Sequence, residues 1–218
     1  MTRRTLALLG DSMTDCWGEA IELRDELARL RPQIEWNIEN HGLGGTRLGY
    51  GLWRISNDYD KNGAHRACLS FGDPDLVLVE SFAYNNRADG EKWVDEYLGV
   101  IRRVVETLRR TTRAKILLWN TIAPDREHFI EPVLAFHATS FERRREMADE
   151  VTLYQNALRG LAGNEGWAFA DVATETLRRD EPLALWINQG DGIHPSRAGY
   201  KLCAQVLGAA LERGNLLD

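Results

Sequence analysis

The sequence predicts an α/β fold, a three-layer α/β/α sandwich built around a five-stranded parallel sheet. Five short apolar runs recur along its 218 residues, at positions 5–9, 34–38, 76–79, 116–119 and 167–172. The segments between these runs carry apolar residues every three or four positions, which is the period of an amphipathic helix. Strands that alternate with helices form right-handed βαβ units, and five such strands fit a flavodoxin-like sheet covered on both faces.

Three segments carry the clearest helical faces, and each comes after a predicted strand. They run from Ala20 to Leu30, from Val94 to Leu108 and from Gly199 to Ala210. A helix is also expected from Trp17 onward, soon after the first strand ends. No repeat, low-complexity tract or Pro/Gly/Ser-rich linker divides the chain, so residues 1–218 are expected to form one domain.

The composition argues against several function classes. Hydrophobic residues make up 44% and charged residues 28%, as in ordinary globular proteins, and the net charge of −6 gives no bias toward nucleic acid. The three cysteines form no CxxC pattern, so neither a disulfide framework nor a structural zinc site is expected. No apolar run reaches about 18 residues and no signal peptide is visible, which predicts no membrane span and a cytoplasmic location. The oligomeric state is left open.

Polar loops follow the predicted strands at the edge where parallel α/β sheets bind their ligands. They span residues 10–12, 40–47 and 80–86, and a fourth polar loop, at 190–196, precedes the last helix and can fold back to the same edge. Together they supply a serine, a glycine-rich turn, an asparagine pair and an Asp-x-x-His sequence. This is the set of residue types that nucleophilic acyl transfer requires.

Ser12 lies at a strand-to-helix corner, and such a serine is often only a helix N-cap. The sequence Asp191-x-x-His194 favours a catalytic interpretation. A carboxylate three residues before a histidine can accept from its Nδ1–H, which leaves Nε2 free to take a proton from a serine. Asp11 is expected to hold the corner through hydrogen bonds, and Glu80 to be buried without a catalytic role.

At this point the chain resembles the SGNH hydrolases, also called the GDSL esterase/lipase family. Gly10-Asp11-Ser12 is similar to the nucleophile block, Asn40-x-Gly42-x-Gly44-Gly45 to the glycine block, and Asp191-x-x-His194 to the final block. The third block departs from the usual Gly-x-Asn-Asp, because it reads Ala83-Tyr84-Asn85-Asn86. The alignment favours Asn85 over Asn86 as the residue that enters the site.

The resemblance implies a mechanism and assigns its residues. Ser12, His194 and Asp191 would form the catalytic triad. The backbone N–H groups of Ser12 and Gly45 and the side-chain amide of Asn85 would form the oxyanion hole. No metal or organic cofactor is implied, and the partner is a small-molecule ester.

The predicted function is therefore that of a serine esterase. We expect short-chain acyl or acetyl esters as substrates, with carbohydrate esters among the candidates, because bulky side chains surround the predicted site. Arg47, Phe82 and Tyr84 are the candidate substrate-binding residues, and the segment from Pro124 to Phe141 is expected to fold over the site as a partial lid. The alternatives are a thioesterase or lysophospholipase using the same site, a non-catalytic binding protein, and a nucleotide-binding flavodoxin-like protein.

Overall fold

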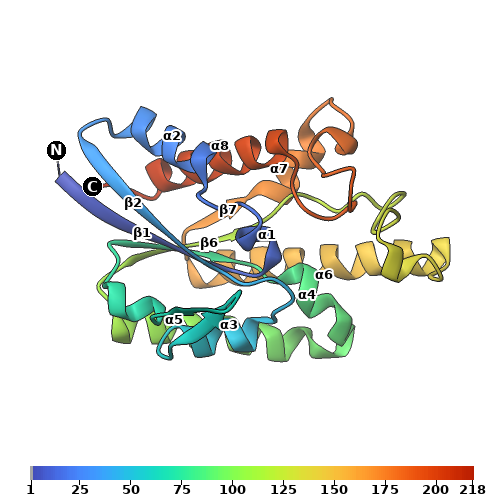
Figure 1. Ribbon diagram of the computed structural model, residues 1–218, viewed down its shortest axis with the longest axis horizontal. Coiled ribbons are helices and arrows are strands. Elements are labelled where there is room, and N and C mark those ends of the chain that lie inside the picture. The colour runs from blue at the N-terminus through green and yellow to red at the C-terminus, as the bar shows by residue number, and fades with distance from the viewer. Residues whose placement is uncertain (1) are drawn as a thin grey trace.

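The computed structural model describes residues 2–218, and its centre is a five-stranded parallel sheet (Figure 1). The strands lie in the order β2-β1-β5-β6-β7, and every neighbouring pair is parallel. Their bounds are β1 Thr2–Gly10, β2 Ile34–Gly42, β5 Leu76–Glu80, β6 Lys115–Asn120 and β7 Phe169–Asp171. Each predicted apolar run coincides with one of these strands. The predicted three-layer fold class is confirmed.

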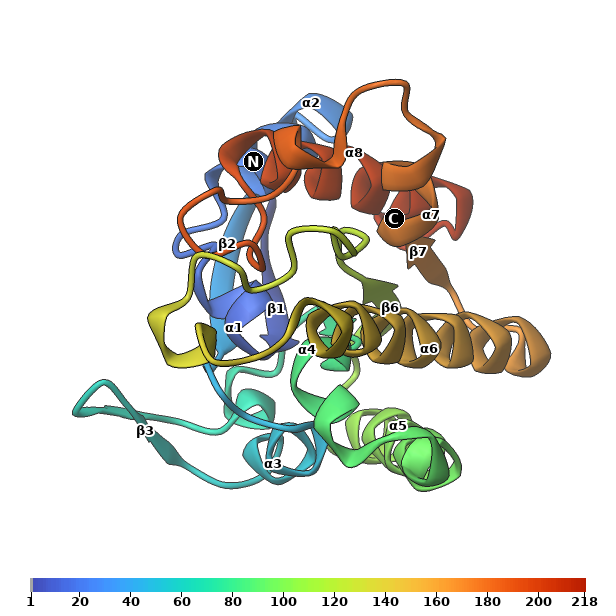
Figure 2. The ribbon, with the colours of Figure 1, turned by 90° about the vertical axis from the view of Figure 1, so that its right-hand side faces the viewer.

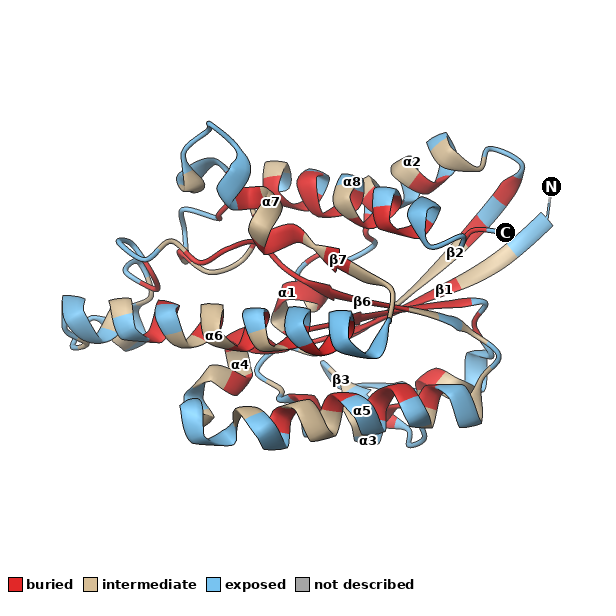
Figure 3. Cartoon of the chain, turned by 180° about the vertical axis from the view of Figure 1, so that it is seen from behind, coloured by how far each residue is buried: buried red, intermediate tan, exposed pale blue. Residues whose placement is uncertain are grey.

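Helices cover both faces of this sheet (Figures 1 and 2). Helices α2 (Ile21–Leu30), α7 (Val172–Arg178) and α8 (Arg197–Arg213) lie on one side. Helices α3 (Leu48–Arg54), α5 (Val94–Thr111) and α6 (Phe141–Glu165) lie on the other. The central strand β5 is wholly buried between the two layers, as are the carboxyl-terminal parts of β1 and β6, while the outer faces of the helices are exposed (Figure 3). The helices predicted at 20–30, 94–108 and 199–210 therefore cover the sheet, as their apolar faces require.

The chain after the first strand differs from the prediction. Instead of a helix from Trp17, a four-residue helix α1 (Ser12–Asp15) ends before it, and α2 begins only at Ile21. Gly18 and Ala20 separate the two helices, because both have positive φ angles, of 59° and 48°. A left-handed backbone cannot continue a right-handed helix, so the chain turns here.

A small antiparallel hairpin, β3 (Tyr59–Lys61) with β4 (Ala64–Arg66), was not among the predicted elements. It projects from the body of the molecule (Figure 2). Its turn residues Asn62 and Gly63 both have positive φ angles, of 54° and 77°. Asn-Gly is the commonest two-residue hairpin turn for this reason, so the sequence did carry a signal for the hairpin.

The remaining elements are short. They are helix α4 (Ala83–Asn86) and the 3₁₀ turns at Leu69–Gly72, Arg87–Asp89, Glu91–Trp93, Leu134–Phe136 and Leu183–Leu185. None of the helices found between residues 2 and 218 is both long and apolar enough to cross a lipid bilayer.

Candidate active site

The corner after β1 holds Ser12 at the start of α1, at the carboxyl edge of the sheet (Figure 2). Asp11 caps this helix by accepting a hydrogen bond from the backbone N–H of Met13 at 2.9 Å, and its side chain is fully buried. Ser12 is half-buried and so can be reached from solvent. The N-cap role that the serine alone could have filled therefore belongs to Asp11.

Gly10 makes this corner possible. A Cβ at this position would lie 1.9 Å from Thr14 Oγ1 and 2.9 Å from Glu80 Cβ. These separations are far below van der Waals contact, so no other residue fits without moving the start of α1 or the end of β5. The glycine thus lets α1 turn back tightly over the ends of two central strands.

Asp191 and His194 form a doubly hydrogen-bonded pair. Nδ1 of His194 lies 2.9 Å from Asp191 Oδ2, and the backbone N–H of His194 donates to Oδ1 of the same carboxylate at 2.9 Å. Pro195 follows the histidine, and Ser196 caps α8 by accepting from Gly199 N–H at 3.1 Å. The imidazole is therefore held in one orientation with Nε2 pointing away from Asp191.

Two residues that the sequence analysis did not single out shape this loop. Asn188 donates from Nδ2 to Asp191 Oδ2 at 3.0 Å, and its backbone N–H donates to the carbonyl of His194 at 2.8 Å. Gly192 has a φ angle of 67°, and a Cβ there would lie 2.8 Å from the carbonyl oxygen of His128. The Asn-x-Gly-Asp-Gly pattern is typical of such a turn and could have identified both residues.

His194 packs beside α1. The Cys16 side chain, one helical turn after Ser12, contributes to raising the pKa of the imidazole, and Tyr200 of α8 donates a hydrogen bond to the carbonyl of Met13 at 3.2 Å. No hydrogen bond joins His194 Nε2 to Ser12 Oγ. Nucleophile–base hydrogen bonds are commonly long or poorly aligned before substrate binds, so the arrangement is compatible with a triad.

The hydrogen bonds between Asp191 and His194 stabilise the charged form of both side chains. Burial opposes the ionisation of Asp191, but hydrogen bonds from the side chain and backbone of His194 and from the backbone of Ile193 hold its pKa below the usual range. Burial also acts to lower the pKa of His194, yet its interactions with Asp191 and Cys16 outweigh that effect and raise the pKa to about 10. The carboxylate of Asp191 therefore stabilises the protonated imidazole, which is the form that a general base reaches after it accepts a proton.

The glycine-rich loop after β2 is tied to α1. Asn40 donates from Nδ2 to the carbonyl of Thr14 at 2.9 Å, and the backbone N–H of Gly44 donates to Asp15 Oδ2 at 3.0 Å. A Cβ at Gly44 would lie 3.6 Å from Ser12 Cβ, so the loop runs directly past the serine. Gly45 has a φ angle of 70° and open space around its α-carbon.

The two asparagines of the third block point to different places. Asn85 is half-buried and donates from Nδ2 to Asp11 Oδ2 at 2.7 Å, which places its amide beside the serine corner. Asn86 is buried, and its Oδ1 accepts from the backbone N–H of Leu48 at 3.0 Å. Of the pair, only Asn85 reaches the corner, whereas Asn86 fastens α4 to α3.

The candidate substrate-binding residues do not line the site as expected. Phe82 is fully buried and Tyr84 is only 6% exposed, since both pack into the hydrophobic core, and Tyr84 donates to the carbonyl of Ile122 at 3.1 Å. The free energy of the folded protein is lower with these large rings buried in the core than with the rings exposed to water. The prediction that these two rings contact substrate does not fit this placement. Arg47 is exposed and forms an ion pair with Asp89.

The segment from Pro124 to Phe141 does lie against the Asp191–His194 loop. Phe129 and Ile130 are fully buried and anchor it, and the backbone of His128 and Ile130 closely approaches Gly192. Leu134, by contrast, is 79% exposed. The segment therefore combines a fixed end at the candidate site with an exposed apolar end.

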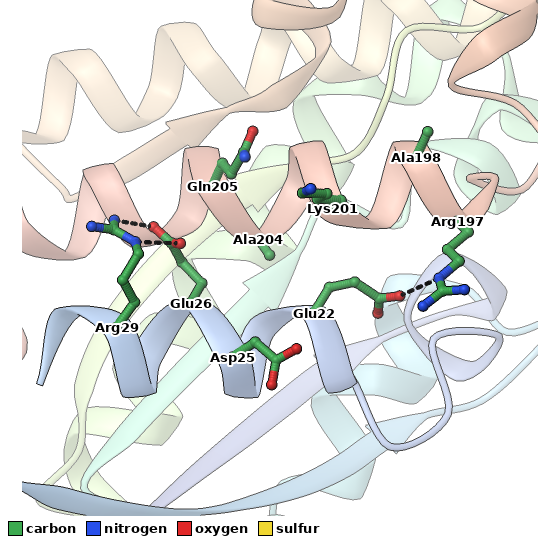
Figure 4. Close-up of a pocket in the computed structure, with 9 residues that line it drawn as sticks. All are labelled: Glu22, Asp25, Glu26, Arg29, Arg197, Ala198, Lys201, Ala204 and Gln205. Atoms are coloured by element: carbon green, nitrogen blue, oxygen red, sulfur yellow. Dashed lines mark hydrogen bonds and ion pairs between the residues drawn. The ribbon is translucent and has the colours of Figure 1, made fainter. Parts of the chain in front are cut away.

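Two grooves lie near these elements. One, of about 560 Å³, runs between α2 and α8 (Figure 4). It is lined mainly by side chains of mixed charge, with Glu22 paired with Arg197 and Glu26 paired with Arg29, and it contains none of the predicted site residues. The other, of about 850 Å³, lies beside β2 and the hairpin, and Asp15, which also holds Gly44, lines its edge.

Within residues 2–218, no group of three or more His, Cys, Asp or Glu side chains is placed to hold a metal ion. Asp191 and His194 are side chains of these types at the candidate site, and they are hydrogen-bonded to each other.

The GDSL-like lipase/acylhydrolase family matches residues 8–202. Among curated proteins no sequence relative was found.

Similar solved structures cover nearly the whole chain. A catalytic mutant of Axe2, an acetylxylan esterase from Geobacillus stearothermophilus, superposes with a TM-score of 0.67 at 17% identity, covering 97% of this chain and 95% of that one. LAE5, an alpha/beta hydrolase enzyme from the metagenome of Lake Arreo in Spain, superposes with a TM-score of 0.66 at 21% identity, covering 100% and 98%. At sequence identities of 17% and 21%, the structural similarity supports the fold alone.

Proposed function

The chain belongs to the GDSL-like lipase/acylhydrolase family, so it is a carboxylic ester hydrolase, and we propose that it works through a Ser12–His194–Asp191 triad. The observation that carries the proposal is the Asp191–His194 pair, in which a carboxylate orients an imidazole. A histidine oriented in this way makes a serine within its reach nucleophilic, and the effect of Cys16, four residues after Ser12, on the pKa of His194 supports the choice of Ser12.

In the proposed reaction, Ser12 Oγ forms a bond to the ester carbonyl carbon while His194 Nε2 takes the hydroxyl proton. The tetrahedral oxyanion accepts hydrogen bonds from the backbone N–H groups of Ser12 and Gly45 and from Asn85 Nδ2. The ester C–O bond then breaks, and His194 gives its proton to the departing alcohol. Water repeats the sequence on the acyl-enzyme and releases the acid.

For the substrate we propose short acyl esters, with acetylated carbohydrates as the leading class. The 850 Å³ groove supports a polar alcohol moiety, because the exposed side chains of Glu19, Arg24 and Arg66 line it together with the exposed ring of Phe71. Hydroxyl groups of a sugar match such donors and acceptors, and an aromatic ring suits the apolar face of a sugar. The similar Axe2 is an acetylxylan esterase, which is consistent with this class.

The test is kcat/KM for p-nitrophenyl esters with acyl chains from two to sixteen carbons, followed by acetylated sugars. We expect an optimum at two to four carbons and no activation at a lipid interface. An optimum at eight carbons or longer would favour a thioesterase or lysophospholipase instead. A fluorophosphonate probe separates an enzyme from a binding protein, because it labels only an activated serine.

A further inference from the structure

Two buried carboxyl groups meet directly beneath the serine corner. Asp11, between β1 and α1, and Glu80, the last residue of β5, are both fully buried, and they stand at the neighbouring ends of two strands that pair up to Leu9 and Val79. The missing side chain at Gly10 is what lets Glu80 approach so closely. The mechanism proposed above assigns no role to either group.

The hydrogen bonds around the pair distinguish the two carboxyl groups. Asp11 accepts from Met13 N–H at 2.9 Å and from Asn85 Nδ2 at 2.7 Å. Glu80 Oε1 accepts from Ser81 Oγ at 2.6 Å, but Oε2 has no partner among the described residues. Two adjacent buried carboxylates cannot both ionise, so one proton must remain on the pair. Asp11 accepts hydrogen bonds on both of its oxygens and so is the better stabilised anion, which leaves the proton on Glu80.

We propose that Glu80 is a positioning residue, a neutral acid that donates its proton in a hydrogen bond to Asp11 and so fixes the amide of Asn85. This inference rests on the proposed oxyanion role of Asn85. As an anion, Asp11 can only accept hydrogen bonds, so the end of the Asn85 amide that faces it must be the nitrogen. One amide hydrogen is engaged by Asp11, and the second is left for the oxyanion.

The groups that surround the pair keep it in this state. Burial, followed by the charge of Asp11, raises the pKa of Glu80 well above its usual range, and burial also raises that of Asp11. The other ionisable groups whose charges act on the pair come from four elements: Tyr84 from α4, Tyr97 from α5, Arg54 from α3, and Cys203 and Tyr200 from α8; His194 also acts on Asp11. Burial raises the pKa of the three tyrosines and of Cys203, so these four side chains are neutral.

Arg54 balances the remaining negative charge. It is fully buried in α3, its Nη2 donates to the carbonyl of Gly10 at 3.0 Å, and its charge acts on Asp11. One buried cation and one buried anion neutralise each other, whereas a second carboxylate would leave a net charge in the core, which is costly. The charge count therefore also favours a neutral Glu80.

A double-mutant cycle on kcat tests whether Glu80 acts through Asn85. We expect Glu80→Met, which removes the donor at similar size, to lower kcat by at least about tenfold, since one oxyanion donor contributes about 10²–10³. KM should change little. In an Asn85→Ala background, Glu80→Met should lower kcat less than about threefold further, because the group it positions is already absent. Glu80→Gln should restore most of the kcat that Glu80→Met loses, since its amide also donates to Asp11.

Losses that add in the double mutant would show that Glu80 acts only on the fold, and the proposal would fail. The proposal would also fail if Glu80→Gln were as inactive as Glu80→Met in a folded protein, because donation of a hydrogen bond to Asp11 would then not be what Glu80 contributes.

The protonation of Glu80 is also measurable without turnover. The infrared spectrum of the wild-type chain at pH 7 should contain the carbonyl stretch of a protonated carboxylic acid, and the difference spectrum against Glu80→Gln should assign it. Absence of this band would overturn the proposal. A band present in a chain that hydrolyses no ester would instead contradict the proposed function, so the two failures are distinguishable.

Discussion

Asp191 holds His194 through both of its carboxylate oxygens, one to the ring and one to the backbone N–H, each at 2.9 Å. The orientation of the ring is therefore set by two hydrogen bonds, one at its Nδ1 atom and one at the backbone N–H of the same residue. Asn188 adds a third bond to the same carboxylate at 3.0 Å. The proposed base is thus orientated without any contact to Ser12, which leaves its Nε2 available for the serine proton.

The first prediction concerns Ser12. Ser12→Ala should abolish ester hydrolysis and fluorophosphonate labelling, because the loss of a triad nucleophile costs on the order of 10⁴–10⁶ in kcat. The fold should be unaffected, since Asp11 and not Ser12 caps α1. A folded mutant that keeps more than about a tenth of the wild-type kcat would contradict the assignment.

The second prediction separates the two asparagines. Asn85→Ala should lower kcat by about 10²–10³ with little change in KM, as expected for one oxyanion donor. Asn86→Ala should instead lower the free energy of unfolding by about 1–3 kcal/mol, because it leaves the buried N–H of Leu48 without an acceptor. Kinetics and denaturant unfolding on both variants provide the check. A larger kcat loss for Asn86→Ala would mean that the third block is misaligned by one residue.

The third prediction is a pH dependence. An unperturbed histidine titrates near pH 6.5. Because its interactions raise the pKa of His194 to about 10, the rise of kcat/KM with pH should be centred well above 6.5. Cys16→Ala removes one of the interactions that raise this pKa, so the rise should move to lower pH. An identical profile for wild type and Cys16→Ala would show that the thiol does not act on the imidazole.

The same shift has a consequence for stability. The folded state binds the His194 proton more tightly than the unfolded state. The stabilisation of the fold that results from this proton is therefore fully present below about pH 6.5. It is lost as the pH rises toward about 10. Unfolding midpoints measured across this range should therefore fall more steeply for wild type than for His194→Ala.

The fourth prediction concerns Gly192. Gly192→Ala should lower both stability and kcat, because alanine is strained at a φ of 67° and its Cβ would lie 2.8 Å from the His128 carbonyl. The left-handed conformation alone costs roughly 1–2 kcal/mol in a residue with a Cβ. The clash would also displace the loop that carries Asp191 and His194, so activity should fall more than stability alone explains.

Gly163→Ala in α6 is the matched control. It makes the same chemical change inside a helix, and its Cβ would meet nothing within 4 Å. It should raise the free energy of unfolding by up to about 1 kcal/mol and leave kcat unchanged. Equal effects of the two substitutions would contradict the special role of the turn at Gly192.

The sequence by itself determined the sheet, the family and the candidate chemistry. Apolar runs fix where strands are buried, and every one of the five lies in the central sheet. The resemblance in four ordered blocks is borne out by a family match over residues 8–202. The roles assigned to Ser12, Asp191, His194, Gly45 and Asn85 stay predictions that the experiments above address.

Only the tertiary structure decided which side chains face the core and which face the site. Phe82 and Tyr84 precede Asn85 in the chain, but long-range packing buries both rings, with Phe82 close to Gly51 of α3 and Tyr84 bonded to Ile122 after β6. The break between α1 and α2 depends on left-handed residues whose conformation no apolar period reveals. The pairing of Asp11 with Glu80 joins residues 69 positions apart, since 80 − 11 = 69, and follows from the register of β1 with β5. Contacts of this range depend on the whole fold, because neighbouring strands of a parallel sheet come from distant parts of the chain.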